Sequence, residues 1–257
     1  MKWFLLFITL SISSKLLACE CVEWNFEARY RFSDFIATAK IISVSDAFEN
    51  NEYQKVEIEI IELYKGKHIS SLSEANVKKT NCGIYTPANT TWLIFASYDS
   101  AGILNFGLCS GSIQVDNISY DPKYPNYKRN VEAKIQHTID ILAYLKKIKL
   151  FNLNEHGLII NMATTCIQDL KGYETNNQKF AIYEITVSKN LAIAKVKNLK
   201  SFDNEVLSQK LLACIKNDAT VNTRKFKKIP FKTKVIVIYF YNPGDQNNPS
   251  FLSKQVY

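Results

Sequence analysis

Glycine and histidine are scarce in this 257-residue chain, which has only eight glycines and three histidines. It contains no Gly-rich loop of the kind that cradles phosphate groups and no Gly-x-Ser-x-Gly motif for a serine nucleophile. His68, His137 and His156 are scattered, with no His-x-x-x-His pair to ligate a metal. We therefore expect no catalytic residues and no cofactor, and we interpret the chain as a protein that is not an enzyme.

Long apolar runs are also missing beyond residue 18, because no later stretch reaches the roughly 18 apolar residues of a membrane helix. The apolar segment Trp3–Ile12 follows Lys2 and precedes the small residue Ala18. This pattern is typical of a signal peptide over residues 1–18. We expect an exported chain, secreted or periplasmic, with no transmembrane segment and with cysteines free to oxidise.

The sequence Leu16-Leu17-Ala18-Cys19 admits a second interpretation, because it also resembles a bacterial lipobox. In that case Cys19 is lipidated and the protein is a lipoprotein. The chain has six cysteines, which pair evenly, whereas lipidation of Cys19 leaves an odd five. Cysteine parity favours disulfides but leaves both interpretations open.

Charge divides the chain into two halves. Residues 19–150 hold 15 Lys and Arg against 16 Asp and Glu, whereas residues 151–257 hold 15 against 8, a net charge of +7. Such a shift indicates two domains, of which the second is basic. An anionic surface is therefore a candidate partner of the second domain, and a solvated lysine-rich face is the alternative.

Alternation of apolar and polar residues predicts a small β-barrel or sandwich in the first half. Val56, Ile58 and Ile60 fall on one face of their segment, with charged residues on the other. The expected strands are Phe32–Val44, Tyr53–Leu63, Thr91–Ser97, Ile103–Leu108 and Ser110–Val115, with a further strand or loop in residues 68–80. Asn126–Ile148 has helical periodicity, and we expect this helix to pack on the barrel and close the first domain near residue 150.

The residue pattern of the second half predicts a small α+β domain of ββαβ type over residues 151–257. Lys179–Val187 and Leu191–Val196 are expected to form a hairpin, and Thr233–Tyr241 to form the final strand. A helix capped by Asp203 or Ser201 is expected to run to about Lys216. The fold class is therefore mainly β with α.

The motifs of the first half, taken in order, resemble the netrin-like module known from the tissue inhibitors of metalloproteinases. They begin with Cys19-Glu20-Cys21 at the predicted mature N-terminus and the strand Phe35–Ile41. Tyr64-Lys65-Gly66, Asn81-Cys82-Gly83, the strand Trp92–Ala96 and Leu108-Cys109-Ser110 follow. The resemblance covers about residues 19–145, and it implies a five-stranded OB-type barrel.

The same resemblance implies disulfides between Cys19 and Cys82 and between Cys21 and Cys109. In the inhibitors, the amine and carbonyl of the first cysteine chelate the zinc of a target protease, and the next side chain enters its specificity pocket. Cys19 would then be the chelator, provided that its amine is free. Glu20 departs from the family, which places a small uncharged residue there, because a carboxylate pays a desolvation cost in an apolar pocket.

The second half resembles, over about residues 158–242, the C-terminal domain of TonB-type energy transducers, in which a hairpin leads to a helix and a final strand. The aromatic-Pro motif is reduced here to Lys228-Ile229-Pro230. Cys166 and Cys214 are the remaining cysteine pair, and we expect them to bond within this domain.

The sequence leaves two candidate functions. The first is an exported protein-interaction module presenting Cys19, Glu20 and Cys21, and the second is an inhibitor that binds a zinc metalloprotease through Cys19. Nucleic-acid binding, which many OB barrels perform, is disfavoured by export and by the near-neutral charge of the barrel.

Overall fold

The structure is a computed structural model that describes residues 20–21, 24–45, 53–75, 83–118, 123–124, 126–151, 154–176 and 179–254. Contacts group these residues into two compact units. The first contains the residues up to Cys21 together with Asp34–Asn117, and the second contains Trp24–Ser33 together with the residues from Ile118 onward. The predicted leader, residues 1–18, lies outside the described residues.

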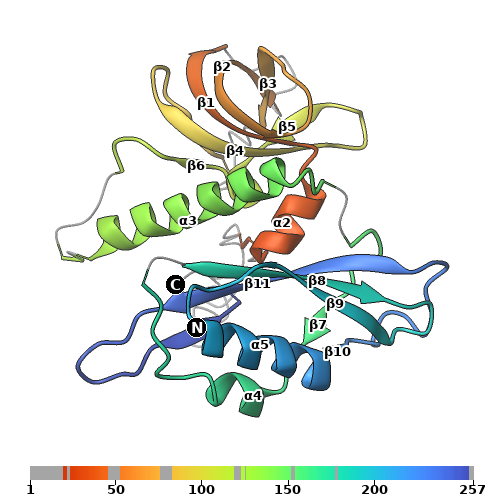
Figure 1. The fold of residues 1–257 in the computed structure, drawn as a ribbon. Helices are drawn as coiled ribbons and strands as arrows, with labels where there is room; N and C mark the ends of the chain where they lie inside the picture. Colours follow the sequence, from red (N-terminus) through yellow and green to blue (C-terminus); the bar gives the residue numbers. More distant parts are fainter. Residues whose placement is uncertain are drawn as a thin grey trace, which may run out of the picture. The chain divides into compact units, whose positions relative to one another are not determined.

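The first unit is a closed five-stranded barrel of OB-like topology (Figure 1). Its strands are β1 (Phe35–Val44), β2 (Tyr53–Lys65), β3 (Ser71–Ala75), β4 (Thr91–Tyr98) and β5 (Leu104–Phe106). They pair in the order β1-β2-β3-β5-β4, and β4 pairs back onto β1 to close the barrel. The β3–β5 pair is parallel, with Ser73 opposite Asn105, and the other pairs are antiparallel. A two-residue strand, β6 (Ile113–Gln114), extends the sheet beside β4.

The barrel interior is filled by alternate residues of its strands, as the period of two requires. Phe35, Ala37, Ala39 and Ile41 of β1 are all buried and belong to one apolar cluster. The remaining buried members of this cluster are Val56, Ile58, Leu72, Trp92, Ile94, Ala96 and Phe106. The predicted alternation of β2 is confirmed at Val56 and Ile58, while Ile60 packs against the cluster partly buried.

The second unit is built on a four-stranded sheet with the order β12-β11-β8-β9 (Figure 1). Its central strands, β8 (Phe180–Val187) and β11 (Thr233–Asn242), pair antiparallel over eight residues. β9 (Ile193–Lys200) lies beyond β8, and β12 (Phe251–Ser253) pairs with the end of β11. The order of strand, strand, helix and strand is as expected, but β12 follows Thr233–Tyr241, so that segment is not the last strand.

Both faces of the β8–β11 pair are covered, which accounts for the nearly continuous apolar sequence of the two strands. One face, with Tyr183, Ile185, Val235 and Val237, belongs to the cluster that includes Leu211 of helix α5 (Glu205–Asp218). The other face carries buried residues outside that cluster, namely Phe180, Ile182, Ile236, Ile238 and Phe240. Figure 1 shows α5 against one face, with α2 (Phe26–Phe32) and α3 (Tyr127–Lys147) against the other.

Helix α3 groups with the second unit, whereas the sequence placed the domain boundary after it, near residue 150. The Tyr144 hydroxyl donates a hydrogen bond to the Leu199 carbonyl at 2.5 Å. In addition, Leu145 lines a cavity together with Ile236 and Ile238 of β11. The apolar stripe of α3 indicated a buried face, but a stripe alone does not say which surface it covers.

Short elements complete the second unit, and several of them were not expected. β7 (Ile160–Asn161) pairs with β10 (Thr220–Val221), and α4 (Thr164–Gln168) contacts α5. The N-cap of α5 is Asn204, whose side chain accepts from the Leu207 amide, rather than Asp203 or Ser201. Among the described helices, none is long and apolar enough to cross a membrane.

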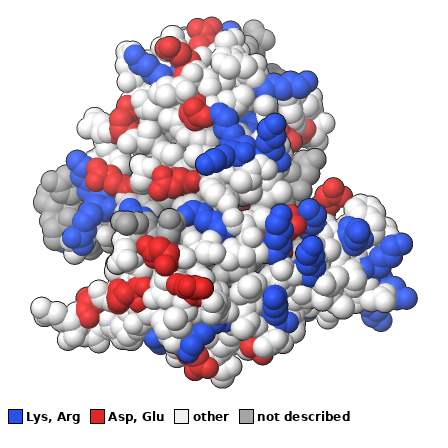
Figure 2. All heavy atoms as spheres, viewed as in Figure 1, with Lys and Arg blue, Asp and Glu red and all other residues white. Residues whose placement is uncertain are grey.

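Charge is unevenly spread over the surface of the molecule. Figure 2 shows Lys and Arg side chains gathered on one side of the second unit. The barrel displays both signs on the same view. On this face, the positive charge predicted for residues 151–257 is therefore gathered rather than evenly spread.

Gly66, at the end of β2, provides a stability test of the barrel. Its φ is +95°, and an added Cβ would lie 2.7 Å from the Asp34 carbonyl oxygen. We expect Gly66→Ala to destabilise the first unit by about 3 kcal/mol, combining a left-handed backbone with a steric clash. Urea unfolding followed by the fluorescence of buried Trp92 would measure this loss.

Gly102 is the matched control, because its φ is +78° but nothing lies within 4 Å of its added Cβ. Gly102→Ala should therefore cost only about 1 kcal/mol, the backbone contribution alone. Equal losses for the two variants would contradict the described approach of β2 to Asp34.

Candidate functional site

The candidate binding site is the N-terminal edge, which we define as Glu20, Cys21 and the 3-10 helix η1 (Leu108–Ser110). Cys21 forms a disulfide with Cys109 of η1, 88 residues away, with the Cα atoms 5.2 Å apart. This is the bond that the netrin-like resemblance implies. Glu20 is exposed and Cys21 is half-buried. The bond therefore holds an exposed carboxylate beside the barrel.

Cys19 and Cys82 lie outside the described residues. Their disulfide and the zinc-chelating role of Cys19 therefore stay predictions.

The barrel fixes the η1 end of this bond through a serine network. The Ser110 hydroxyl donates to the Ser112 hydroxyl oxygen at 2.8 Å, and the Phe95 amide donates to the same oxygen at 2.9 Å. Gly111 ends η1 in the left-handed conformation with a φ of 80°. Because Phe95 is a buried residue of β4, Cys109 is connected to the barrel wall within a few residues.

Exposed apolar side chains lie on the same segment of chain as η1. Leu108 is 42% exposed, Ile103 is 37% exposed and Ile113 is 36% exposed. Apolar residues exposed singly are ordinary on protein surfaces, but three within eleven residues flank one anchored disulfide. An exposed carboxylate together with apolar side chains is suited to protein contact, because protein interfaces combine apolar area with polar groups.

A second unusual group is Glu27 of α2, whose carboxylate is buried in the second unit. Its Oε1 accepts a hydrogen bond from the Ile238 amide of β11 at 3.3 Å. Its Oε2 is shielded from solvent and has no hydrogen-bond partner among the described residues. Burial raises the pKa of Glu27 to about 6, against the opposing effects of backbone hydrogen bonds and of the positive charge on Lys254.

Helix α2 is positioned by several polar contacts along the open edge of β11. The Tyr30 hydroxyl donates to the Leu150 carbonyl at 2.9 Å, and the Arg31 guanidinium donates to the Asn154 carbonyl at 3.3 Å. The Asn154 amide in turn donates to the Lys234 carbonyl of β11 at 2.8 Å. The helix therefore helps to cover a strand edge that would otherwise offer unpaired backbone groups.

The cavity beside Glu27 is about 10 Å³, which is room for about one water molecule. The residues that line it are Phe26, Glu27, Tyr30, Leu145, Asn154, Ile236 and Ile238. A site of this size does not admit an organic substrate. We therefore interpret Glu27 as a group that affects stability rather than as a catalytic acid.

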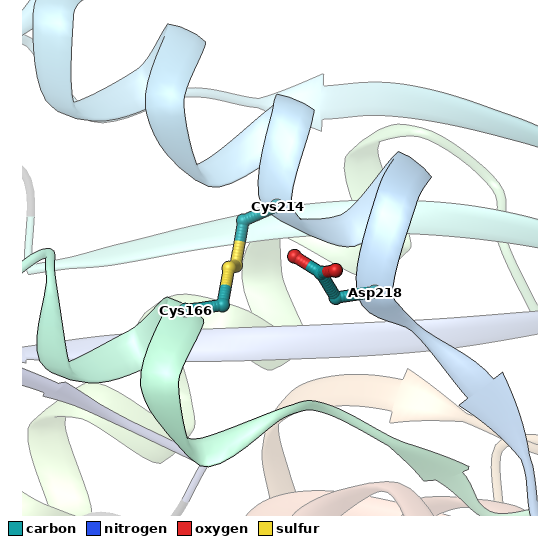
Figure 3. Close-up of side chains that lie close together, drawn as sticks. All are labelled: Cys166, Cys214 and Asp218. Atoms are coloured by element: carbon teal, nitrogen blue, oxygen red, sulfur yellow. A yellow bond between two sulfur atoms is a disulfide. The ribbon is translucent and has the colours of Figure 1, made fainter.

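A third constellation surrounds the disulfide of the second unit (Figure 3). Cys166 of α4 bonds to Cys214 of α5, and their Cα atoms lie 5.9 Å apart. The Asp218 carboxylate, one helical turn after Cys214, lies within 4.8 Å of the sulfur atoms. A thiolate pair with a carboxylate is a possible ligand set, but the disulfide engages both sulfurs and thus leaves no thiolate for a metal.

The three histidines are not part of this constellation. Across the described ranges, Cys166, Cys214 and Asp218 form the only such group of His, Cys, Asp and Glu residues. His156 instead packs against the ring of Phe231 at 4.8 Å, and His137 is half-buried on α3, where burial lowers its pKa. The expectation that the protein is not an enzyme stays a prediction.

Comparison with known proteins does not assign this chain to a family. No protein-family model matches the sequence, and no curated protein matches it either. The fold that the structure defines is an OB-like closed barrel with a disulfide at its N-terminal edge, joined to an α+β unit. The netrin-like and TonB-like resemblances therefore rest on the motifs quoted above.

The sequence alone did not indicate that Glu27 is buried or that Asp218 lies beside a disulfide. The helical spacing of Trp24–Tyr30 predicts a short helix around Glu27, but one charged residue on a short helix is normally exposed. Asp218 had a weak signal, because it follows Cys214 by four residues and so lies on the same helix face. Nothing in the sequence indicates that α2 belongs to the second unit.

The raised pKa of the buried Glu27 carboxyl predicts how the free energy of unfolding depends on pH. The folded chain binds this proton more tightly than the unfolded chain, because the pKa rises from 4.5 to about 6 on folding. Its stabilising contribution is therefore complete below about pH 4.5 and is lost as pH rises through about 6. We expect Glu27→Gln to be more stable than the unsubstituted chain by up to about 2 kcal/mol above pH 7, with the difference shrinking towards pH 4.5.

Urea unfolding of both chains between pH 4 and 8 would measure this difference. The matched control is Glu155→Gln, which makes the same substitution at an exposed residue. If Glu27→Gln changes the free energy of unfolding by the same amount at pH 4 and at pH 8, the result would contradict the burial of the charged carboxylate.

Proposed function

We propose that this protein is an exported, disulfide-stabilised protein-interaction module without catalysis of its own. The observation that carries the proposal is the Cys21–Cys109 bond, which attaches an exposed N-terminal segment to the barrel. A segment held in one conformation loses less entropy when it binds, so the bond favours recognition by the N-terminal edge.

The compartment follows from the chemistry of the cysteines. Cys21–Cys109 and Cys166–Cys214 are disulfides, which persist in oxidising compartments and are rare in reducing ones. Together with the leader pattern of residues 1–18, this supports export to the periplasm or to the exterior. A free amine at Cys19 and a lipidated Cys19 are both compatible with export.

A narrower function is supported by the same disulfide. In the netrin-like inhibitors, the corresponding bond places the first cysteine for zinc chelation, and Cys19 lies two residues before Cys21. The alternative function is therefore inhibition of a zinc metalloprotease through the Cys19 amine and carbonyl. Exposed Glu20 would then meet the specificity pocket, and a target with a cationic or open pocket would avoid the desolvation cost.

The interaction module is tested by capture of partners from the exported protein fraction of the source cells. We expect Leu108→Asp to remove the partners that the unsubstituted chain retains, because it introduces a charge into the apolar part of the N-terminal edge. Ile61→Asp is the matched control, since Ile61 is 60% exposed on β2 and lies outside the edge. Partners that survive Leu108→Asp but not Ile61→Asp would place the binding surface elsewhere.

The inhibitor hypothesis is tested first by the intact mass of the mature protein. This mass reports the cleavage position, acylation and number of disulfides together, and a free-amine Cys19 is required. Inhibition across a panel of zinc proteases should then fall by at least about 100-fold when one alanine is added before Cys19, because the added residue displaces the chelating amine. Inhibition that is unchanged by the added residue, or an acylated Cys19, would exclude this mechanism.

A further inference from the structure

Three exposed lysines share one face of the second-unit sheet, near the turn between β8 and β9. Lys234 of β11 and Lys195 of β9 both pair with Thr186 of β8, so they flank it from opposite sides. Lys197 pairs with Glu184, two residues along β8 on the same face. Glu184 is the one acidic residue in β8, β9 and β11, so the cations of this row outnumber its carboxylates.

The basic loop Arg224–Lys232 adjoins the same turn. It carries five cations and no acid, and its cationic side chains are exposed. Buried Ile229 anchors it, because the Ile229 amide donates to the Lys189 carbonyl of the turn at 3.0 Å. Phe226 of the same loop is partly buried and packs against the core cluster. These two apolar anchors leave Lys225, Lys227 and Lys228 facing solvent.

We call Lys189, Lys195, Lys197, Lys234 and the loop Arg224–Lys232 the lysine end. Figure 2 shows the concentration of positive charge on this unit. The sequence has no acidic residue between Glu184 and Asp203 or between Asp218 and Asp245. Glu184 is only 11% exposed and pairs with Lys234 at 3.1 Å.

Exposed Glu155 precedes His156, whose ring contacts Phe231 of the basic loop. One accessible carboxylate does not balance the cations of the lysine end. The surface therefore keeps a strong positive potential, which attracts anionic partners.

Phe231 distinguishes between classes of anionic partner. It is 48% exposed and lies between Pro230 and Lys232 within the basic loop. A sulfated polysaccharide offers a phenyl ring little apolar contact, whereas a bilayer interface accepts an aromatic ring while its phosphates pair with flanking lysines. Lysine side chains are long enough to keep their charge at the headgroups while the ring enters.

We propose that the lysine end binds the surface of a bilayer that contains anionic phospholipids. Lys225, Lys227 and Lys228 contact the lipid phosphates, and Phe231 enters the interfacial region. The lysines of the sheet face extend the contact by electrostatic attraction. This inference concerns the second unit and does not depend on the N-terminal edge or on its partner.

The experiment is sedimentation of the mature chain with vesicles of phosphatidylcholine, with and without phosphatidylglycerol. We expect binding only when phosphatidylglycerol is present, and we expect it to weaken as salt is added. The triple variant Lys225→Gln, Lys227→Gln, Lys228→Gln should bind on the order of 100-fold more weakly. Phe231→Ala should bind roughly 5- to 10-fold more weakly with little change in salt dependence.

The matched control is Lys147→Gln, Lys171→Gln, Lys216→Gln, which removes the same charge from exposed positions outside the lysine end. This variant should bind as the unsubstituted chain does. We expect circular dichroism to show that each variant keeps its fold, because the substituted residues are exposed.

Two results would overturn the proposal. One is equal vesicle binding by the two triple variants, since net charge rather than the lysine end would then explain the attraction. The other is binding to heparin or to a single-stranded oligonucleotide without binding to phosphatidylglycerol vesicles, which would assign the surface to a soluble polyanion. Vesicle binding is measured independently of protein capture, so failure here is distinguishable from failure of the interaction module.

Discussion

The disulfide between Cys21 and Cys109 is the constraint on which the N-terminal edge depends. Residues 20–21 belong to no helix or strand, so pairing within a sheet does not hold them. In the chain-entropy account, a crosslink that closes a loop of 88 residues contributes about 4 kcal/mol. This covalent bond therefore holds Cys21 against the barrel without help from strand pairing.

The chain leaves the barrel unit directly after this bond and enters it again at Asp34. Between these points, α2 belongs to the second unit and covers part of the edge of β11. Glu27 provides a hydrogen-bond acceptor for the Ile238 amide, but its burial costs free energy because the charged form is desolvated. A neutral acceptor at residue 27 would avoid that cost.

Sequence periodicity predicted the long elements well. The β1, β2, β4, β8 and β11 segments were recognised because each repeats an apolar pattern over eight or more residues. The short strands β10 and β12 were missed, because a segment of two or three residues has no period to detect, whereas β6 falls within the predicted strand Ser110–Val115. The parallel β3–β5 pair could not be derived from local patterns either, since it joins segments about 30 residues apart.

By itself, the sequence determined the apolar periods, the even number of cysteines and the positive charge of the second half. These properties are local or additive, so they can be found without knowing which segments meet. Only the tertiary structure decided that Glu27 is buried against β11, that Asp218 lies beside a disulfide, and that lysines of β9, β11 and a loop gather at one end. Each of these depends on strand register and chain path, which bring together residues whose spacing in the sequence carries no signal.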